Sequence, residues 1–152
     1  MAEQLKIFYA DDDPDDLNFF RDVAGSIDRP IELSTHDEGD ELLKALRTSD
    51  PDHEIVFLDL NMRGKDGFDI LREIRETAGM EMVPVVILST TSDAKSVNRC
   101  LKYGANFYLQ KPTSFAALKK SIEDAISIDY STFRPTKKNF LYRSAANRNV
   151  VL

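Results

Sequence analysis

The sequence has little of what several common kinds of site require. It contains one cysteine, Cys100, in 152 residues, which excludes an internal disulfide framework and a zinc site built from several cysteines. Its two histidines are not spaced for a metal site. No run is long and apolar enough to span a membrane, and the first residues lack the pattern of a signal peptide. We therefore expect a cytoplasmic protein with no membrane partner.

Positive charge is also scarce over most of the chain, whose formal net charge is -6. Residues 129–152 hold five basic residues against Asp129 alone, a net charge of +4, so residues 1–128 carry −10. An acidic balance argues against nucleic-acid binding, which needs a positive potential. With 42% hydrophobic and 30% charged residues, the chain suits one globular domain. We predict a domain over residues 4–128 and a basic tail over 129–152.

Apolar runs alternate with amphipathic segments along the domain. Strands are predicted at residues 5–10, 30–34, 55–58, 84–88 and 106–109. Apolar residues at helical spacing follow each strand, and Asp13-Pro14 is typical of a helix start. Five strand–helix pairs predict an α/β fold, an open doubly wound parallel sheet with helices on both faces. Five pairs are too few for an eight-fold barrel.

Chemically active side chains follow four of the predicted strands. They are Asp11 to Asp13 after the first strand, Asp59 after the third, Ser89 after the fourth and Lys111 after the fifth. Taken alone, the acidic run would be a solvated helix cap and Asp59 a turn residue. Together they meet at one edge of the sheet, where clustered carboxylates call for a cation such as Mg²⁺. A carboxylate beside Mg²⁺ and a lysine can bind or accept a phosphoryl group.

These markers resemble the bacterial response-regulator receiver domain of the chemotaxis-regulator type over about residues 4–128. Phe57-Leu58-Asp59-Leu60-Asn61-Met62 followed by Asp66-Gly67 resembles the phosphorylation loop of that family, and Gly104-Ala105 and Lys111-Pro112 also match. The resemblance implies a flavodoxin-like sheet of strand order 2-1-3-4-5. It also implies a single-domain response regulator of a two-component phosphorelay, with no enzymatic activity beyond its own Mg²⁺-dependent phosphorylation and dephosphorylation.

The resemblance assigns a role to each matching residue of the phosphorylation site. Asp59 would be the phosphoacceptor. Asp12 would bind Mg²⁺ directly, Asp11 would bind it mainly through water, and Asn61 would offer its backbone carbonyl. Ser89 would contact the phosphoryl oxygens. Lys111 would pair with the phosphate, or with Asp59 before phosphorylation.

The resemblance also implies a switch. Tyr108 occupies the aromatic switch position of the family and would change rotamer together with Ser89. The surface formed by the fourth helix, the fifth strand and the fifth helix would then change shape. The Lys–Pro peptide bond at this place is usually cis in the family, so the resemblance implies a cis Lys111–Pro112 bond.

Two residues near these markers are interpreted as ordinary. Arg63 stands where the family usually has proline; we interpret it as an exposed arginine with no special role, although it could reach the phosphate or a partner. Tyr9 lies inside the first strand and is interpreted as a packing residue.

The implied partners are proteins rather than DNA. A histidine kinase or a phosphotransfer protein would donate the phosphoryl group, and a downstream protein would read the switch. The tail is too short for a DNA-binding output domain, and it contains the apolar group Phe140-Leu141-Tyr142. We expect the tail to pack on its own receiver or on a second copy, as a homodimer.

Three rival classes share parts of this pattern. Phosphatases of the haloacid dehalogenase type need a second aspartate two residues after the first, where this chain has Asn61. Flavodoxins need a phosphate loop after the first strand, where this chain has aspartates. A receiver fold that is never phosphorylated would not need the full set of aspartates, hydroxyl and lysine.

Overall fold

Five parallel strands form one sheet in the order β2-β1-β3-β4-β5 in the computed structural model, which describes residues 4–49 and 53–142. The strands are β1 (Leu5–Ala10), β2 (Ile31–His36), β3 (Glu54–Leu58), β4 (Val85–Ser89) and β5 (Phe107–Gln110). The helices are α1 (Pro14–Gly25), α2 (Gly39–Arg47), α3 (Gly67–Glu76), α4 (Ala94–Lys102) and α5 (Phe115–Ile126). The predicted fold class and strand order are confirmed.

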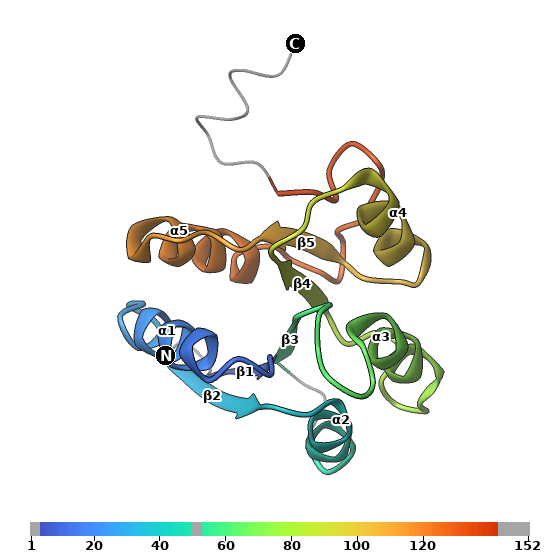
Figure 1. Cartoon of the computed structure of the whole chain (residues 1–152), viewed down its shortest axis with the longest axis horizontal. Coiled ribbons are helices and arrows are strands. Elements are labelled where there is room, and N and C mark those ends of the chain that lie inside the picture. The colour runs from blue at the N-terminus through green and yellow to red at the C-terminus, as the bar shows by residue number, and fades with distance from the viewer. Residues whose placement is uncertain (1–3, 50–52, 143–152) are drawn as a thin grey trace.

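Helices cover both faces of the sheet. Helices α1 and α5 lie on one face, and α2, α3 and α4 lie on the other (Figure 1). Every residue of β3 and β4 is buried, because these strands run between the two layers of helices. The apolar runs 55–58 and 85–88 therefore serve two hydrophobic cores, one on each side of the sheet.

Side-chain caps begin most of the helices directly after the loops that follow the strands. The Asp13 carboxylate accepts a hydrogen bond from the Asp15 amide, and Pro14 occupies the first turn of α1 as predicted. Asp66, Asp93 and Ser114 cap α3, α4 and α5 in the same way. Each of these caps fixes the start of its helix beyond the carboxyl end of the preceding strand.

The bounds of β2 to β5 differ from the prediction by one or two residues at most ends, and two of these differences have a clear cause. Strand β2 extends to His36 because it pairs residue by residue with all of β1, up to Ala10. Strand β5 begins at Phe107 rather than Asn106. The Asn106 side chain instead accepts hydrogen bonds from the Val85 amide and from Arg75.

The first part of the tail packs on the receiver. Phe140 is 1% exposed, and Leu141 forms a parallel bridge with Tyr108 of β5. In Figure 1 the orange and red segment after α5 returns to the outer side of β5. The expectation that the tail packs on its own receiver is confirmed as far as Tyr142. The basic residues Arg143 and Arg148 lie outside the described residues.

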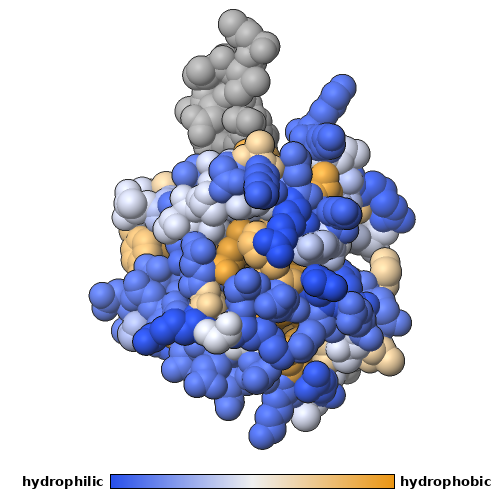
Figure 2. Space-filling model, turned by 45° about the vertical axis from the view of Figure 1, so that its right-hand side comes forward, coloured by the Kyte–Doolittle hydropathy of each residue, from blue (hydrophilic) through white to orange (hydrophobic). Residues whose placement is uncertain are grey.

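The side of the molecule that carries α3 and α4 is mostly hydrophilic, with a small hydrophobic area near its centre (Figure 2). Two large hydrophobic side chains, Met82 and Phe115, are exposed in the described part of the chain. Within residues 4–49 and 53–142, no helix has the length and apolar character needed to cross a membrane.

Replacing Gly67 with alanine should destabilise the fold. A Cβ atom at Gly67 would lie 2.5 Å from the Asp59 carbonyl oxygen and 2.6 Å from the Leu60 Cα. These are backbone atoms, so the loop after β3 would have to move. We expect Gly67→Ala to lower the free energy of unfolding by about 1–3 kcal/mol in urea denaturation.

The matched control is Gly25→Ala at the end of α1, where an added Cβ meets nothing within 4 Å. Alanine favours helix, so this variant should be neutral or slightly more stable. Equal stability of the two variants would contradict the close packing at Gly67.

Candidate functional site

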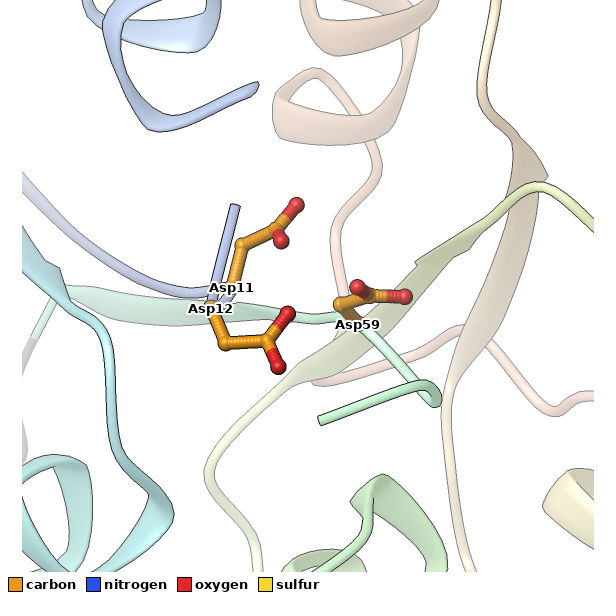
Figure 3. A group of neighbouring side chains, drawn as sticks. All are labelled: Asp11, Asp12 and Asp59. Carbon is orange, nitrogen blue, oxygen red and sulfur yellow. The ribbon is translucent and has the colours of Figure 1, made fainter. Parts of the chain in front are cut away.

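Three aspartates gather at the carboxyl edge of the sheet. Asp11 and Asp12 follow β1, and Asp59 follows the neighbouring strand β3. One carboxylate oxygen from each lies within 4.8 Å of the others, and the three side chains surround one space in Figure 3. Asp11 and Asp59 are buried, and Asp12 is half-buried. The sequence prediction that these carboxylates share one edge is confirmed.

Lys111, just after β5, is the cation beside this group. Its Nζ lies 2.7 Å from Asp11, 2.9 Å from Asp16 and 3.3 Å from Asp59. Burial lowers the pKa of Lys111, but its hydrogen bonds to Asp11 and Asp16 outweigh burial and raise the pKa above its usual value. The lysine therefore stays charged. Its predicted pairing with Asp59 is present, but it lies closer to Asp11 and Asp16.

The pKa of Asp59 is raised toward neutral pH. Burial raises the pKa of Asp59 to about 6, the charge of Lys111 opposes this rise, and Asp11 adds to it. The Asn61 amide donates a hydrogen bond to Asp59 Oδ1 at 3.2 Å. Near neutral pH, Asp59 is therefore mostly ionised, although burial makes its ionised form less favourable than that of an exposed aspartate.

Asp11 is held by a tyrosine that the sequence analysis treated as packing alone. The hydroxyl of Tyr9 donates to Asp11 Oδ2 at 2.5 Å, and the amide of Asp13 donates to Asp11 Oδ1 at 3.0 Å. Tyr9 is buried and stacks on Phe20 with ring centroids 4.2 Å apart. Burial and the nearby Asp11 raise the pKa of Tyr9, so the phenol keeps its proton. Tyr9 therefore packs and also orients Asp11.

Asp12 is contacted by Arg63, the residue that stands in the place of the usual proline. The Arg63 amide donates to Asp12 Oδ2 at 2.9 Å, and its Nε lies 3.3 Å from the same oxygen. The Arg63 side chain is 88% exposed, as interpreted from the sequence. Proline in this place could not donate the amide hydrogen bond to Asp12. The interpretation that Arg63 has no special role stays a prediction. Both residues line an open depression of about 430 Å³.

The predicted switch residues lie next to one another. Ser89 and Tyr108 are both fully buried, at the end of β4 and within β5. The Tyr108 hydroxyl donates to the Thr91 carbonyl at 2.6 Å. Burial raises the pKa of Tyr108 to about 12, and its interaction with the Ser89 side chain opposes this rise. Ser89 also joins β5, because the Lys111 amide donates to its carbonyl at 2.7 Å.

The Lys111–Pro112 peptide bond is trans, since the described residues contain no cis peptide bond. The cis bond usual in the family is therefore not present. Asp16 is the other difference, because it was not among the predicted site residues, yet it lies 2.9 Å from Lys111 Nζ. Its position in the first turn of α1, one helical turn beyond the Asp12-Asp13 pair, was the only signal for its contact with Lys111.

The donor set suits a hard divalent cation. Carboxylate oxygens from Asp11, Asp12 and Asp59 converge, and the open depression beside Asp12 leaves room for water. Lys111 and the exposed Arg63 offset part of the negative charge, but these two cations face the four carboxylates of Asp11, Asp12, Asp16 and Asp59. The residues present therefore fit a metal ion such as Mg²⁺.

Comparison with known proteins agrees with this geometry. The family described as response regulator receiver domain matches residues 7–123. Two-component response regulator ARR17 of Arabidopsis thaliana is 27% identical over 130 residues, covering 79% of this chain and 84% of that protein. ORR4 of Oryza sativa subsp. indica is 33% identical over 93 residues, covering 58% of this chain and 40% of that protein. This chain thus matches less than half the length of the rice protein.

Solved structures are similar over most of the chain. The phosphorylated cyanobacterial phytochrome response regulator RcpA superposes with a TM-score of 0.73 and 26% identity, covering 88% of this chain and 98% of that one. The Mn²⁺-bound form of response regulator Rcp1 gives a TM-score of 0.69 at 24% identity, covering 87% and 99%, and shows the shared fold. The family match, over residues 7–123, spans more than half of this chain. This chain therefore belongs to the response regulator receiver domain family.

The raised pKa of Asp59 predicts a pH dependence of stability in metal-free protein. A folded pKa of about 6 lies above the ordinary value of 3.8, so folding favours the protonated acid. This contribution is present below about pH 4 and is lost as the pH rises through about 6. Asp59→Asn, which cannot ionise, should therefore gain stability relative to the unchanged protein between these pH values. Urea denaturation of both proteins in a chelator tests this, and parallel pH profiles would contradict it.

Proposed function

We propose that this chain is a response-regulator receiver that accepts a phosphoryl group on Asp59 from a histidine kinase or a phosphotransfer protein. The observation that carries this proposal is the group of three carboxylates, Asp11, Asp12 and Asp59, with Lys111 beside it. Such a group combines a carboxylate nucleophile, a place for a metal ion and a fixed positive charge. The division into a receiver over residues 4–128 and a tail over 129–152 is part of the proposal.

In the proposed transfer, an oxygen of Asp59 attacks the phosphorus of the donor. The bond between phosphorus and the donor's imidazole nitrogen breaks, and the nitrogen keeps the electron pair. Asp59 must be ionised to attack, and a pKa of about 6 allows this near neutral pH. Lys111 Nζ lies 3.3 Å from Asp59. Once the lysine leaves Asp16, it is close enough to pair with the transferred phosphoryl group.

Mg²⁺ is the metal ion that we propose for the site. Asp12 would bind it directly and Asp11 through water. Asp59 and the backbone carbonyl of Asn61 would be the remaining protein ligands. When bound, the ion supplies positive charge to the phosphoryl oxygens. The Mn²⁺ bound by the structural neighbour Rcp1 supports a divalent cation here as well. Arg63 would have to share Asp12 Oδ2 with that ion.

The consequence of phosphorylation would be a shift between two states of the receiver. A phosphoryl group adds roughly two negative charges, and Ser89 would move to contact it. Buried Tyr108 would respond through its neighbour Ser89, and the surface of α4, β5 and α5 would change its affinity for a downstream protein. This role needs no enzymatic activity on other molecules and no direct DNA binding. A cytoplasmic location and a homodimer involving the tail stay predictions.

Labelling with a small phosphodonor tests the assignment of Asp59. Acetyl phosphate with Mg²⁺ should add one phosphoryl group to the chain, detected by intact mass. Asp59→Asn should abolish the labelling, and a chelator should prevent it. Asp22→Asn, at an exposed position of α1, is the control and should label normally. Unchanged labelling of Asp59→Asn would overturn the assignment.

The contact between Arg63 and Asp12 predicts a change in metal affinity. Its guanidinium competes with a metal ion for Asp12 Oδ2, but the side chain is exposed, so the competition is weak. Arg63→Ala should tighten Mg²⁺ binding by about 2–5-fold in isothermal titration calorimetry. Arg47→Ala, at the far end of α2, removes the same charge and serves as the control. Equal Mg²⁺ affinities of the two variants would show that Arg63 does not compete.

A further inference from the structure

The outer edge of β5 is paired with the chain's own tail. The Tyr108 amide donates to the Phe140 carbonyl at 3.0 Å, and the Tyr142 amide donates to the Tyr108 carbonyl at 2.8 Å. Strand β5 is the last strand of the sheet, so both main-chain groups of Tyr108 would otherwise face outward. Phe140–Tyr142 therefore act as a short additional strand.

Aromatic side chains fix this segment over the edge. The ring of Phe140 lies 6.1 Å from that of Tyr108, and Phe140 is 1% exposed. The ring of Tyr142 lies 5.8 Å from that of Phe107, and its hydroxyl donates to Asp124 of α5 at 2.6 Å. Main-chain pairing with anchored side chains on alternate residues is how an extended peptide binds a sheet edge.

The residue beneath this segment is the proposed switch. Tyr108 is fully buried, with its hydroxyl bonded to Thr91 and its backbone bonded to the tail. Because the ring packs against Phe140, a change of the Tyr108 rotamer would break that contact. Docking of the tail and the buried state of Tyr108 therefore favour each other, and any ligand that favours one must favour the other.

We propose that the β5 edge is a docking site for an extended segment of the pattern aromatic–aliphatic–aromatic, which residues 140–142 of the same chain occupy. A partner with that pattern would have to displace the tail to bind there. In the proposed function Ser89 moves toward the phosphoryl group and leaves space that the buried Tyr108 ring fills, so docking of the tail would strengthen the phosphorylated state and be strengthened by it. The last step rests on the proposed function, whereas the docking itself does not.

Hydrogen exchange at the Tyr108 amide tests the docking directly in the full chain, because that amide donates to the tail. The Val56 amide, which donates to Pro84 inside the sheet, reports on global opening. Phe140→Ala should speed exchange at Tyr108 on the order of 100-fold and leave Val56 unchanged. Lys137→Ala, at an exposed tail position, is the control and should change neither. Unprotected Tyr108 in the unchanged protein would overturn the proposal.

The same measurement separates the chain's own tail from that of a second copy. Because the tail docks within its own chain, we expect Tyr108 protection that does not depend on protein concentration, whatever the oligomeric state found by sedimentation. Protection that appears only at concentrations where dimers form would overturn the assignment of residues 140–142 of the same chain.

Beryllofluoride with Mg²⁺, a stand-in for the phosphoryl group, tests the linkage. It should slow exchange at Tyr108 further, and Phe140→Ala should bind it several-fold more weakly. Binding without any change at Tyr108 would overturn the linkage. If beryllofluoride does not bind at all while Tyr108 stays protected, the proposed function fails and the docking of the tail stands.

Discussion

Three carboxylates cannot stay ionised within a few ångströms of one another unless positive charge lies among them, and Lys111 meets part of this requirement. Its Nζ contacts Asp11 and Asp16, which lie between the end of β1 and the first turn of α1, and Asp59, which follows β3. The lysine thereby ties the ends of β1, β3 and β5 together at one edge of the sheet. It also lowers the pKa of Asp59 that burial would otherwise raise further, and so keeps the proposed nucleophile ionised near neutral pH.

The fold follows from the sequence because its signals are local. The continuous apolar runs of β3 and β4 predict strands buried on both faces, and Asp13-Pro14 predicts the start of α1. The contacts of the tail were only partly predictable. Apolar residues at 140–142 indicate packing somewhere, but the choice of the β5 edge depends on which main-chain groups the completed sheet leaves unpaired.

The sequence predicted some residues of the site and missed the contacts that support them. Residues that directly follow strands, such as Asp11, Asp59 and Lys111, were found because parallel strands end at one edge. The supporting contacts of Tyr9, Asp16 and Arg63 were not predicted, since each depends on side-chain direction in three dimensions. Arg63 in particular uses its backbone amide as well as its guanidinium, and a residue name does not reveal that.

A crystal structure of the chain with Mg²⁺ and beryllofluoride would test the central claim most directly. The account predicts beryllium on the carboxylate of Asp59, a metal ion on Asp12 beside it, and Lys111 turned from Asp16 to a fluorine atom. An unmodified Asp59 with Lys111 still bound to Asp11 and Asp16, at beryllofluoride concentrations that saturate other receivers, would contradict it.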